Sequence, residues 1–183
     1  MVSAFDHMDY TLKAISYEEA YYLKKYHISL KGWLGSADRV IIKKVPLKHT
    51  SVEFVILPWD CSHLADKEVQ KLFSSLRKGP SLVVGLSPYG YAEEQDLLEK
   101  YPDVFDLLLG SGRGLIFSAR VAGRTLWIRP MSQGKALYLI HIKDVEGLRS
   151  QGAILGDNIS VERRFITHNI APDPQIVSIL EGK

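Results

Sequence analysis

A glycine-rich loop carries the residue types that come nearest to a ligand-binding motif in this sequence. Gly110-Ser111-Gly112-Arg113-Gly114 directly follows the apolar run 106–109, which predicts a buried strand. Ligands of α/β proteins usually bind at the carboxyl ends of strands, and exposed N–H groups beside a guanidinium can hold a phosphate or a carboxylate. The commoner use of such glycines is a loop that needs small residues, because no Walker-type lysine or helix follows.

The single cysteine and the six histidines form no recognisable metal or nucleophile motif. No two histidines have His-x-x-x-His spacing, and none lies at metal-ligand spacing from Cys61. Cys61-Ser62-His63 puts a thiol beside an imidazole, but catalytic dyads are assembled in space rather than from chain neighbours. We therefore interpret Asp60 and His63 as a helix entry and Cys61 as a structural residue.

Four arginines make a local excess of positive charge in a chain whose formal net charge is only +2. On alternating strands some of them would share a face, which suits an anionic partner but is more often a solvated face. No nucleic-acid motif accompanies them, so we expect no nucleic-acid binding. These residues are Arg113, Arg120, Arg124 and Arg129.

Tyrosines are concentrated near the start of the chain, around the predicted helix 17–26. Tyrosine joins a large apolar body to one polar tip and is enriched at interfaces. The cluster is therefore either a contact surface or the core-facing side of this helix, and both interpretations stay open. Its members are Tyr10, Tyr17, Tyr21, Tyr22 and Tyr26.

Strands and helices alternate through the first two thirds of the chain, which predicts a layered α/β domain with some parallel pairing. The tight turn at 122–123 and the later alternating strand indicate an antiparallel ending. The stretch 147–163 is glycine-rich and polar, and no regular element is assigned to it. The predicted strands are 39–45, 51–57, 81–86, 106–109, 114–121, 124–129 and 135–143, and the predicted helices are 17–26, 60–77, 92–100 and a last turn or two in 172–180.

We expect residues 1–183 to form one soluble, cytoplasmic domain with no membrane partner. No apolar run approaches the roughly 20 residues that span a bilayer. The first ten residues place acids where a signal peptide would be basic and then apolar.

Residues 81–114 and the hairpin-containing run 123–142 resemble the second half of a calcineurin-like metallophosphoesterase domain, of the 5′-nucleotidase branch. APDPQIVSIL (171–180) is similar to the family's Asp-Pro-x-Val helix start, and residues 8–26 to its segment that carries Gly-Asn-His-Glu. The resemblance spans nearly the whole chain. It implies a layered α-β-β-α sandwich that lacks the family's N-terminal strands.

Enzymes of this family place two metal ions on His, Asp and Asn ligands at loop ends, where the ions activate water. Matched onto this sequence, the Asn and His of Gly-Asn-His-Glu fall on Tyr17 and Glu18, and the His of the Ser-His loop falls on Pro88. The two His of Gly-Gly-His-x-His fall on Gly112 and Gly114.

The family's Asp-x-His and Gly-Asp motifs would lie upstream of residue 1. Asp6-His7-Met8-Asp9 holds suitable residue types in the wrong order. Since each mapped ligand is replaced, the resemblance implies no catalytic residues, no metal and no other cofactor.

The family geometry would bring the glycine-rich loop near Ser87, Tyr89 and Tyr91, and near Gln133 and Lys135. The candidate anion-binding residues are accordingly Ser87, Gly110, Ser111, Gly112, Arg113, Gly114 and Lys135.

We expect a non-catalytic binding or assembly module with a small anionic ligand. We also expect a homodimer, or a protein partner that covers the edge left by the missing strands. Two alternatives remain: a hydrolase of phosphorylated or nucleotide substrates that uses the 110–114 loop and Lys135, and one half of a split 5′-nucleotidase-like enzyme.

Overall fold

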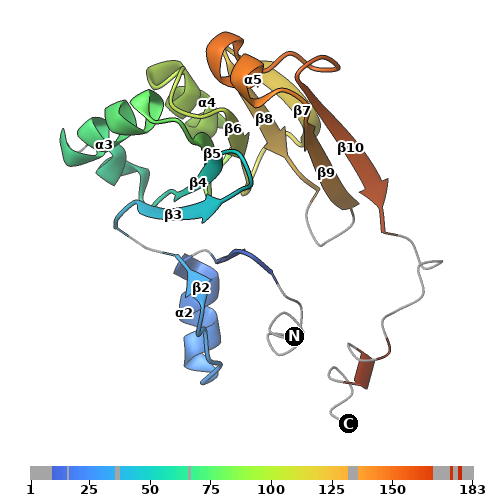
Figure 1. The fold of residues 1–183 in the computed structure, drawn as a ribbon. Coiled ribbons are helices and arrows are strands. Elements are labelled where there is room, and N and C mark those ends of the chain that lie inside the picture. The colour runs from blue at the N-terminus through green and yellow to red at the C-terminus, as the bar shows by residue number, and fades with distance from the viewer. Residues whose placement is uncertain are drawn as a thin grey trace.

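The computed structural model shows a layered body above a smaller lobe that contains α2 (Figure 1). It describes residues 10–15, 17–35, 38–65, 67–131, 136–166, 174 and 177–178. Several predicted features lie outside these residues, namely Lys135 and Gln133 of the candidate site, the segment Asp6–Asp9, and most of the predicted helical turn in 172–180.

A six-stranded mixed sheet forms the centre of the body, in the order β3-β4-β5-β6-β8-β7. Neighbouring strands from β4 to β8 pair in parallel, with Val84 opposite Leu107, whereas β3 and β7 are antiparallel edges. The strands are β3 (Ile41–Pro46), β4 (Ser51–Ile56), β5 (Leu82–Leu86), β6 (Leu107–Leu109), β7 (Phe117–Ala122) and β8 (Thr125–Arg129).

The hairpin at Gly123 contributes its second strand, not its first, to the inside of the sheet. All five residues of β8 are buried, while β7 is only half-buried. A continuous apolar run such as TLWI suits a strand that is covered on both faces. The predicted alternation of strands and helices, the parallel pairing and the antiparallel ending are confirmed.

Helices cover one face of this sheet. They are the 3₁₀ helix η1 (Cys61–Ala65), α3 (Lys67–Lys78) and α4 (Tyr91–Lys100), so the predicted helix 60–77 is divided in two. Because side chains alternate along a strand, every second residue faces this layer. The resulting core contains Leu64, Phe73, Leu76, Leu97 and Leu98 from the helices and Val83, Leu108 and Trp127 from the strands.

The opposite face is covered by β9 (Ala136–Ile142), α5 (Val145–Gln151) and β10 (Ile159–Phe165). Here Leu82, Leu107 and Leu126 pack with Leu148 of α5 and Ile159 of β10. The antiparallel pair β9–β10 forms a second sheet over the first.

Residues 147–163, for which the sequence predicted no regular element, contain most of α5 and most of β10. Asp144 caps α5 by accepting a hydrogen bond from the N–H of Gly147 at 3.0 Å, and Gly152 ends the helix at φ +90°. The segment is polar because both of its elements have a solvent-facing side.

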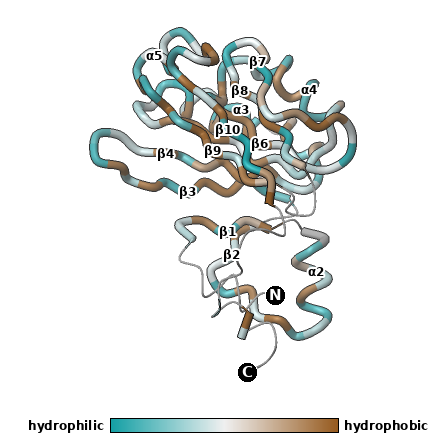
Figure 2. Tube along the Cα trace, turned by 90° about the vertical axis from the view of Figure 1, so that its right-hand side faces the viewer, coloured by the Kyte–Doolittle hydropathy of each residue, from teal (hydrophilic) through white to brown (hydrophobic). Residues whose placement is uncertain are grey.

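The lower lobe contains β1 (Lys13–Ala14), α2 (Tyr17–Lys25) and β2 (Trp33–Leu34), with β1 and β2 paired in parallel. Figure 2 shows β1 and β2 beneath the body, with α2 beside them. Tyr21, Tyr22 and Tyr26 are 65%, 59% and 55% exposed, so they do not face a core. In the described part of the chain, the helices are too short and too polar to cross a membrane.

Candidate ligand-binding site

The carboxyl ends of β4, β5, β6 and β8 meet at the edge of the sheet that faces the lower lobe. Hydrogen bonds carry their alignment into the loops: the N–H of Leu57 donates to Leu86 O at 3.0 Å, that of Ser87 to Leu109 O at 2.9 Å, and that of Gly110 to Ile128 O at 2.8 Å. Ser87 and the glycine-rich loop, which lie 23 residues apart at their nearest, are thus brought together as expected.

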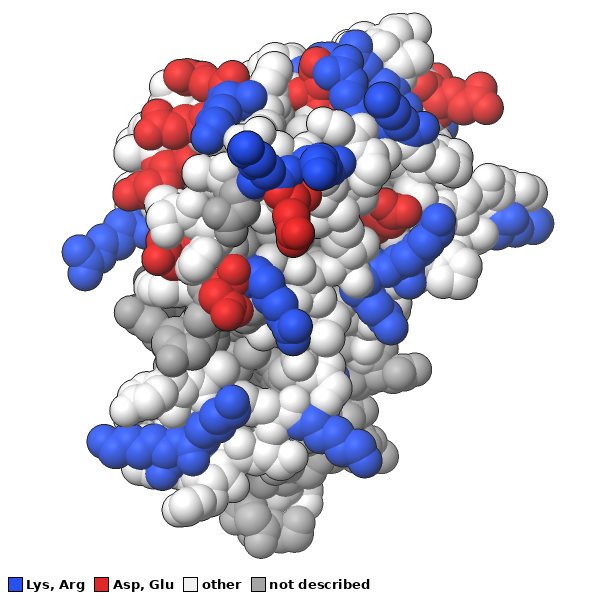
Figure 3. Space-filling model, turned by 90° about the vertical axis from the view of Figure 1, so that its left-hand side faces the viewer, with Lys and Arg blue, Asp and Glu red and all other residues white. Residues whose placement is uncertain are grey.

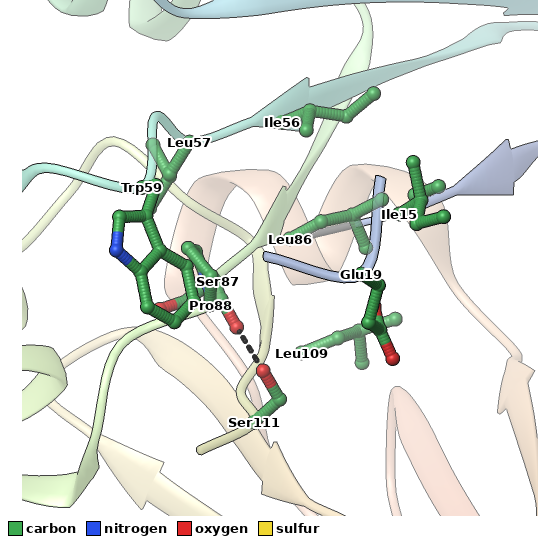
Figure 4. Close-up of a pocket in the computed structure, with 11 residues that line it drawn as sticks. Ile15, Glu19, Ile56, Leu57, Trp59, Leu86, Ser87, Pro88, Leu109 and Ser111 are labelled. Carbon is green, nitrogen blue, oxygen red and sulfur yellow. Dashed lines mark hydrogen bonds between the residues drawn. The ribbon is translucent and has the colours of Figure 1, made fainter. Parts of the chain in front are cut away.

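A cavity of about 300 Å³ lies between this edge and the lobe (Figure 4). Ser111 Oγ donates to Ser87 O at 2.8 Å, and Ser87 Oγ accepts from the N–H of Tyr89 at 3.2 Å. Both serines therefore stabilise the loops themselves. The other lining residues are mostly apolar: Ala14, Ile15, Glu19, Ile56, Leu57, Trp59, Leu86, Pro88 and Leu109.

A buried ion pair lies directly behind the glycine-rich loop. Arg129 Nη1 and Trp127 Nε1 both donate to Glu94 Oε2, the latter at 2.9 Å. The N–H of Ser111 donates to Glu94 Oε1 at 3.1 Å. Burial raises the pKa of Glu94, while the hydrogen bonds from Arg129 and Trp127 oppose that shift. Gly110 is required here, because a Cβ at this position would overlap the Glu94 carboxylate.

The remaining donors of Arg129 hold the carbonyl groups of the loop. Its Nε donates to Leu115 O at 2.7 Å, and its Nη2 donates to Arg113 O at 2.9 Å and to Gly112 O at 3.3 Å. With these carbonyls engaged, the N–H groups of Gly112, Arg113 and Gly114 make no hydrogen bond within the described residues. These residues are exposed, so the loop presents donors to solvent.

The amino terminus of α4 adjoins this loop, because the N–H of Tyr91 donates to Arg113 O at 2.9 Å. Its N-cap residue is Gly90, so no side chain caps the helix. The carboxylate of Glu93 folds back over this end, 3.0 Å from where a Cβ of Gly90 would lie.

Together these groups line a groove of about 630 Å³. It contains Gly112, Arg113 and Gly114 of the predicted site together with Tyr89 and Tyr91, which were expected near the loop. It adds Trp59, Cys61, Pro88 and Gly90, and Ala92 and Glu93 of the first turn of α4. Trp59 and Pro88 also line the inner cavity, so the two hollows share a wall.

Beyond Tyr91, sequence reasoning missed the contribution of the first turn of α4, and it missed Trp59. The available signals were a helix start without a Ser, Thr, Asp or Asn cap, and an aromatic residue just beyond the end of a buried strand. Neither is specific enough to indicate a site without knowing that the two segments meet.

Of the other three arginines of the predicted cluster, Arg124 and Arg129 bind internal groups, and the exposed Arg120 lies beside Tyr91, which lines the groove together with Arg113. Arg120 Nη1 donates to Tyr91 Oη at 3.0 Å. Arg124 Nη2 donates to Arg149 O at 2.6 Å, and Arg129 is buried against Glu94.

Asp60 directly precedes η1, as expected for a helix entry. Its Oδ1 accepts from the N–H of Ser62 at 2.9 Å, and this bond lowers the pKa of Asp60. Cys61 is exposed.

The layered sheets and helices of this chain form a fold of the metallophosphoesterase type. Among solved structures, the sulfate thiohydrolase SoxB of Thermus thermophilus, determined in complex with glycerol, is similar to it with a TM-score of 0.67. SoxB belongs to the 5′-nucleotidase-like metallophosphoesterases, so the expected fold is confirmed. The identity is 15%, and the similarity covers 94% of this chain but 36% of the SoxB chain. No family model and no curated protein matches the sequence.

The described residues do not fit the dinuclear metal centre that the fold implies. Pro88 has no ligand atom, and Gly112 and Gly114 have only main-chain groups to offer. The guanidinium of Arg129 occupies the back of the loop and already binds the carbonyl of Gly112, so it would repel a nearby cation. Within the described ranges, no group of three or more His, Cys, Asp or Glu side chains could hold a metal ion.

Proposed function

We propose that this chain is a non-catalytic module that binds a small oxyanion, a phosphate, sulfate or carboxylate group, in the groove between the glycine-rich loop and α4. One observation carries this proposal: Arg129 engages the carbonyl groups of the loop, while the exposed N–H groups of residues 112–114 make no hydrogen bond with a described residue. Oxyanions are the ligands that such consecutive donors recognise.

Two further groups favour the same ligand. The first turn of α4 has unsatisfied N–H groups and the positive end of the helix dipole, both of which attract anions. Arg113 adds an exposed guanidinium at the same place. Trp59 offers an apolar surface for the rest of the ligand.

Among the described residues, the hydroxyl and carboxylate groups beside and behind the loop are engaged in internal hydrogen bonds, which favours a binding role over catalysis. Ser87 and Ser111 are tied into hydrogen bonds of the loops, and the buried Glu94 carboxylate is bound by three donor groups. A general base or nucleophile needs a side chain that can reach the substrate, and none of these is in that position.

Calorimetric titration with inorganic sulfate and phosphate tests the proposal. We expect saturable binding that Arg113→Ala weakens about tenfold, which corresponds to the loss of one charge-assisted contact. Glu93→Gln should tighten binding, because it removes a carboxylate from the anion site. Glu99→Gln, on the same helix but outside the groove, is the matched control and should leave the affinity for the anion unchanged.

Turnover assays complete the test. The purified chain, after incubation with manganese or zinc, should hydrolyse neither phosphomonoesters nor nucleotides nor S-linked sulfate, the last chosen because the similar structure is a sulfate thiohydrolase. Stoichiometric metal together with turnover would show that this is an enzyme and not a binding module.

A further inference from the structure

The outer side of α2 combines exposed aromatic rings with positive charge. Tyr21 and Tyr22 are the most exposed large hydrophobic residues of this helix, at 65% and 59%. Lys24 and Lys25 follow at three- and four-residue spacing from Tyr21, which places them on the same side of the helix. Neither lysine forms an ion pair within the described chain. These four residues are called the α2 surface.

The outer side of α4 has the opposite charge. Glu93, Asp96 and Glu99 are exposed and repeat every three residues, so they lie along one side of the helix. Glu99 accepts a hydrogen bond from Gln95 Nε2 at 2.9 Å, and none of the three carboxylates forms an ion pair with a described residue. These three residues are called the α4 surface.

The arrangement of charge on the molecule makes these two surfaces mutually complementary in a pair of copies. Figure 3 looks at the side where the helical layer lies above the α2 lobe. In that view Lys and Arg lie on the lobe with no Asp or Glu drawn beside them, whereas Asp and Glu lie above the lobe, several of them along the left-hand margin. Consider a twofold axis that lies in the plane of this side and runs perpendicular to the line from the lobe to the helical layer. It would bring the lobe of each copy against the helical layer of the other. Such a contact is closed and isologous, the commonest symmetry of homo-oligomers.

We propose that two copies of this chain associate through this side, with the α2 surface of each copy against the α4 surface of the other. Tyrosine rings supply contact area that is costly to leave in water. The opposite charges fix the orientation of the two copies and speed their encounter. The two helices have 9 and 10 residues and are thus of similar length.

Sedimentation velocity of the full chain over a concentration series tests this association by charge reversal. We expect a dimer whose dissociation constant rises about tenfold or more in Lys24→Glu/Lys25→Glu, and by a similar factor in Asp96→Lys/Glu99→Lys. An equimolar mixture of these two variants should form a heterodimer with about the affinity of the unmodified chain, because both of its contacts join opposite charges. The protein that carries all four substitutions should regain the affinity of the unmodified chain, because both contacts are complementary again.

A matched control separates the contact from the overall charge. Lys43→Glu/Lys48→Glu changes the net charge by the same amount on β3 and the turn after it, and it should leave the dimer intact. The proposal is wrong if the unmodified chain stays monomeric, if either helix variant dimerises like the unmodified chain, if the control dissociates equally, or if the fourfold variant stays monomeric. Glu93 is left unchanged throughout, so anion binding can be measured separately on the same proteins.

Discussion

At the scale of single residues, the Glu94–Arg129 pair holds the main chain of the glycine-rich loop in place. Glu94 is fully buried and Arg129 is 2% exposed, and their remaining hydrogen bonds reach Trp127 and the main chain of the loop. A buried pair of this kind adds little net stability over an apolar pair, but it defines one arrangement of the groups around it. Here that arrangement is a loop with inward carbonyl groups.

Breaking this pair from one side should be costly. Arg129→Leu leaves the Glu94 carboxylate buried without a counter-charge, and we expect the free energy of unfolding to fall by about 3–5 kcal/mol. Adding Glu94→Leu to this variant should restore part of the loss. Urea denaturation followed by circular dichroism measures both.

The exposed pair Arg164–Glu162 is the control for this comparison. Arg164→Leu should leave the unfolding midpoint unchanged, since exposed ion pairs contribute little. Wild-type stability in Arg129→Leu would contradict the role assigned to the buried pair.

Asp106 should make stability depend on pH. Its Oδ2 accepts from the N–H of Val83 at 2.8 Å, yet burial is the larger effect and raises the pKa of Asp106. The folded chain therefore binds this proton more tightly than the unfolded chain, whose aspartates titrate near pH ~3.9. The stability that Asp106 contributes is full below that pH and is lost as the pH rises through the raised pKa.

Asp106→Asn removes this titration. The difference in unfolding free energy between the unmodified chain and the variant should shift in favour of the variant as the pH rises from about 3 to 7. Denaturant titrations at a series of pH values measure it. A difference that stays constant, or that moves in the other direction, would refute the assignment.

At the scale of elements, the loop between β6 and β7 depends on glycine where its backbone turns. Gly112 has φ +75°, and a Cβ there would also overlap the carbonyl oxygen of Tyr89. Gly156 has φ +88° but nothing within 4 Å of an added Cβ. The two positions thus share the backbone conformation and differ in available space.

Gly112→Ala should therefore abolish sulfate binding and lower stability by about 2–3 kcal/mol, whereas Gly156→Ala should cost about 1 kcal/mol and leave binding unchanged. Calorimetric titration and thermal unfolding of both variants provide the comparison. Equal effects at the two positions would mean that the close packing of the loop on Tyr89 is unimportant.

The buried strands β5 and β8 were predictable from the sequence. Their short, largely apolar runs, LVVGL and TLWI, are typical of strands that are covered on both faces. Residues 147–163 were not, since α5 and β10 each present a polar side and bury only a few residues. The candidate loop was found by its glycines. Its partner Arg129 was read as part of a surface cluster, because burial of an arginine depends on a glutamate 35 residues away.

At the scale of the whole molecule, a metallophosphoesterase-type framework surrounds the proposed oxyanion site. The core on both faces of the sheet is made of apolar side chains that do not depend on the loops at the carboxyl ends. Such a framework can keep its fold while the side chains at its loop ends change, because fold and site have separate requirements. The similarity to SoxB at 15% identity fits this separation.

The most direct test of the account is a titration of the isotopically labelled chain with sulfate, followed by amide resonances in NMR spectra. The account predicts saturable shifts at Gly112, Arg113 and Gly114 and in the first turn of α4, and it predicts that Arg113→Ala weakens them about tenfold. If these amides remain unmoved at saturating sulfate, or shift only when manganese or zinc is added, the oxyanion site proposed for this groove does not exist.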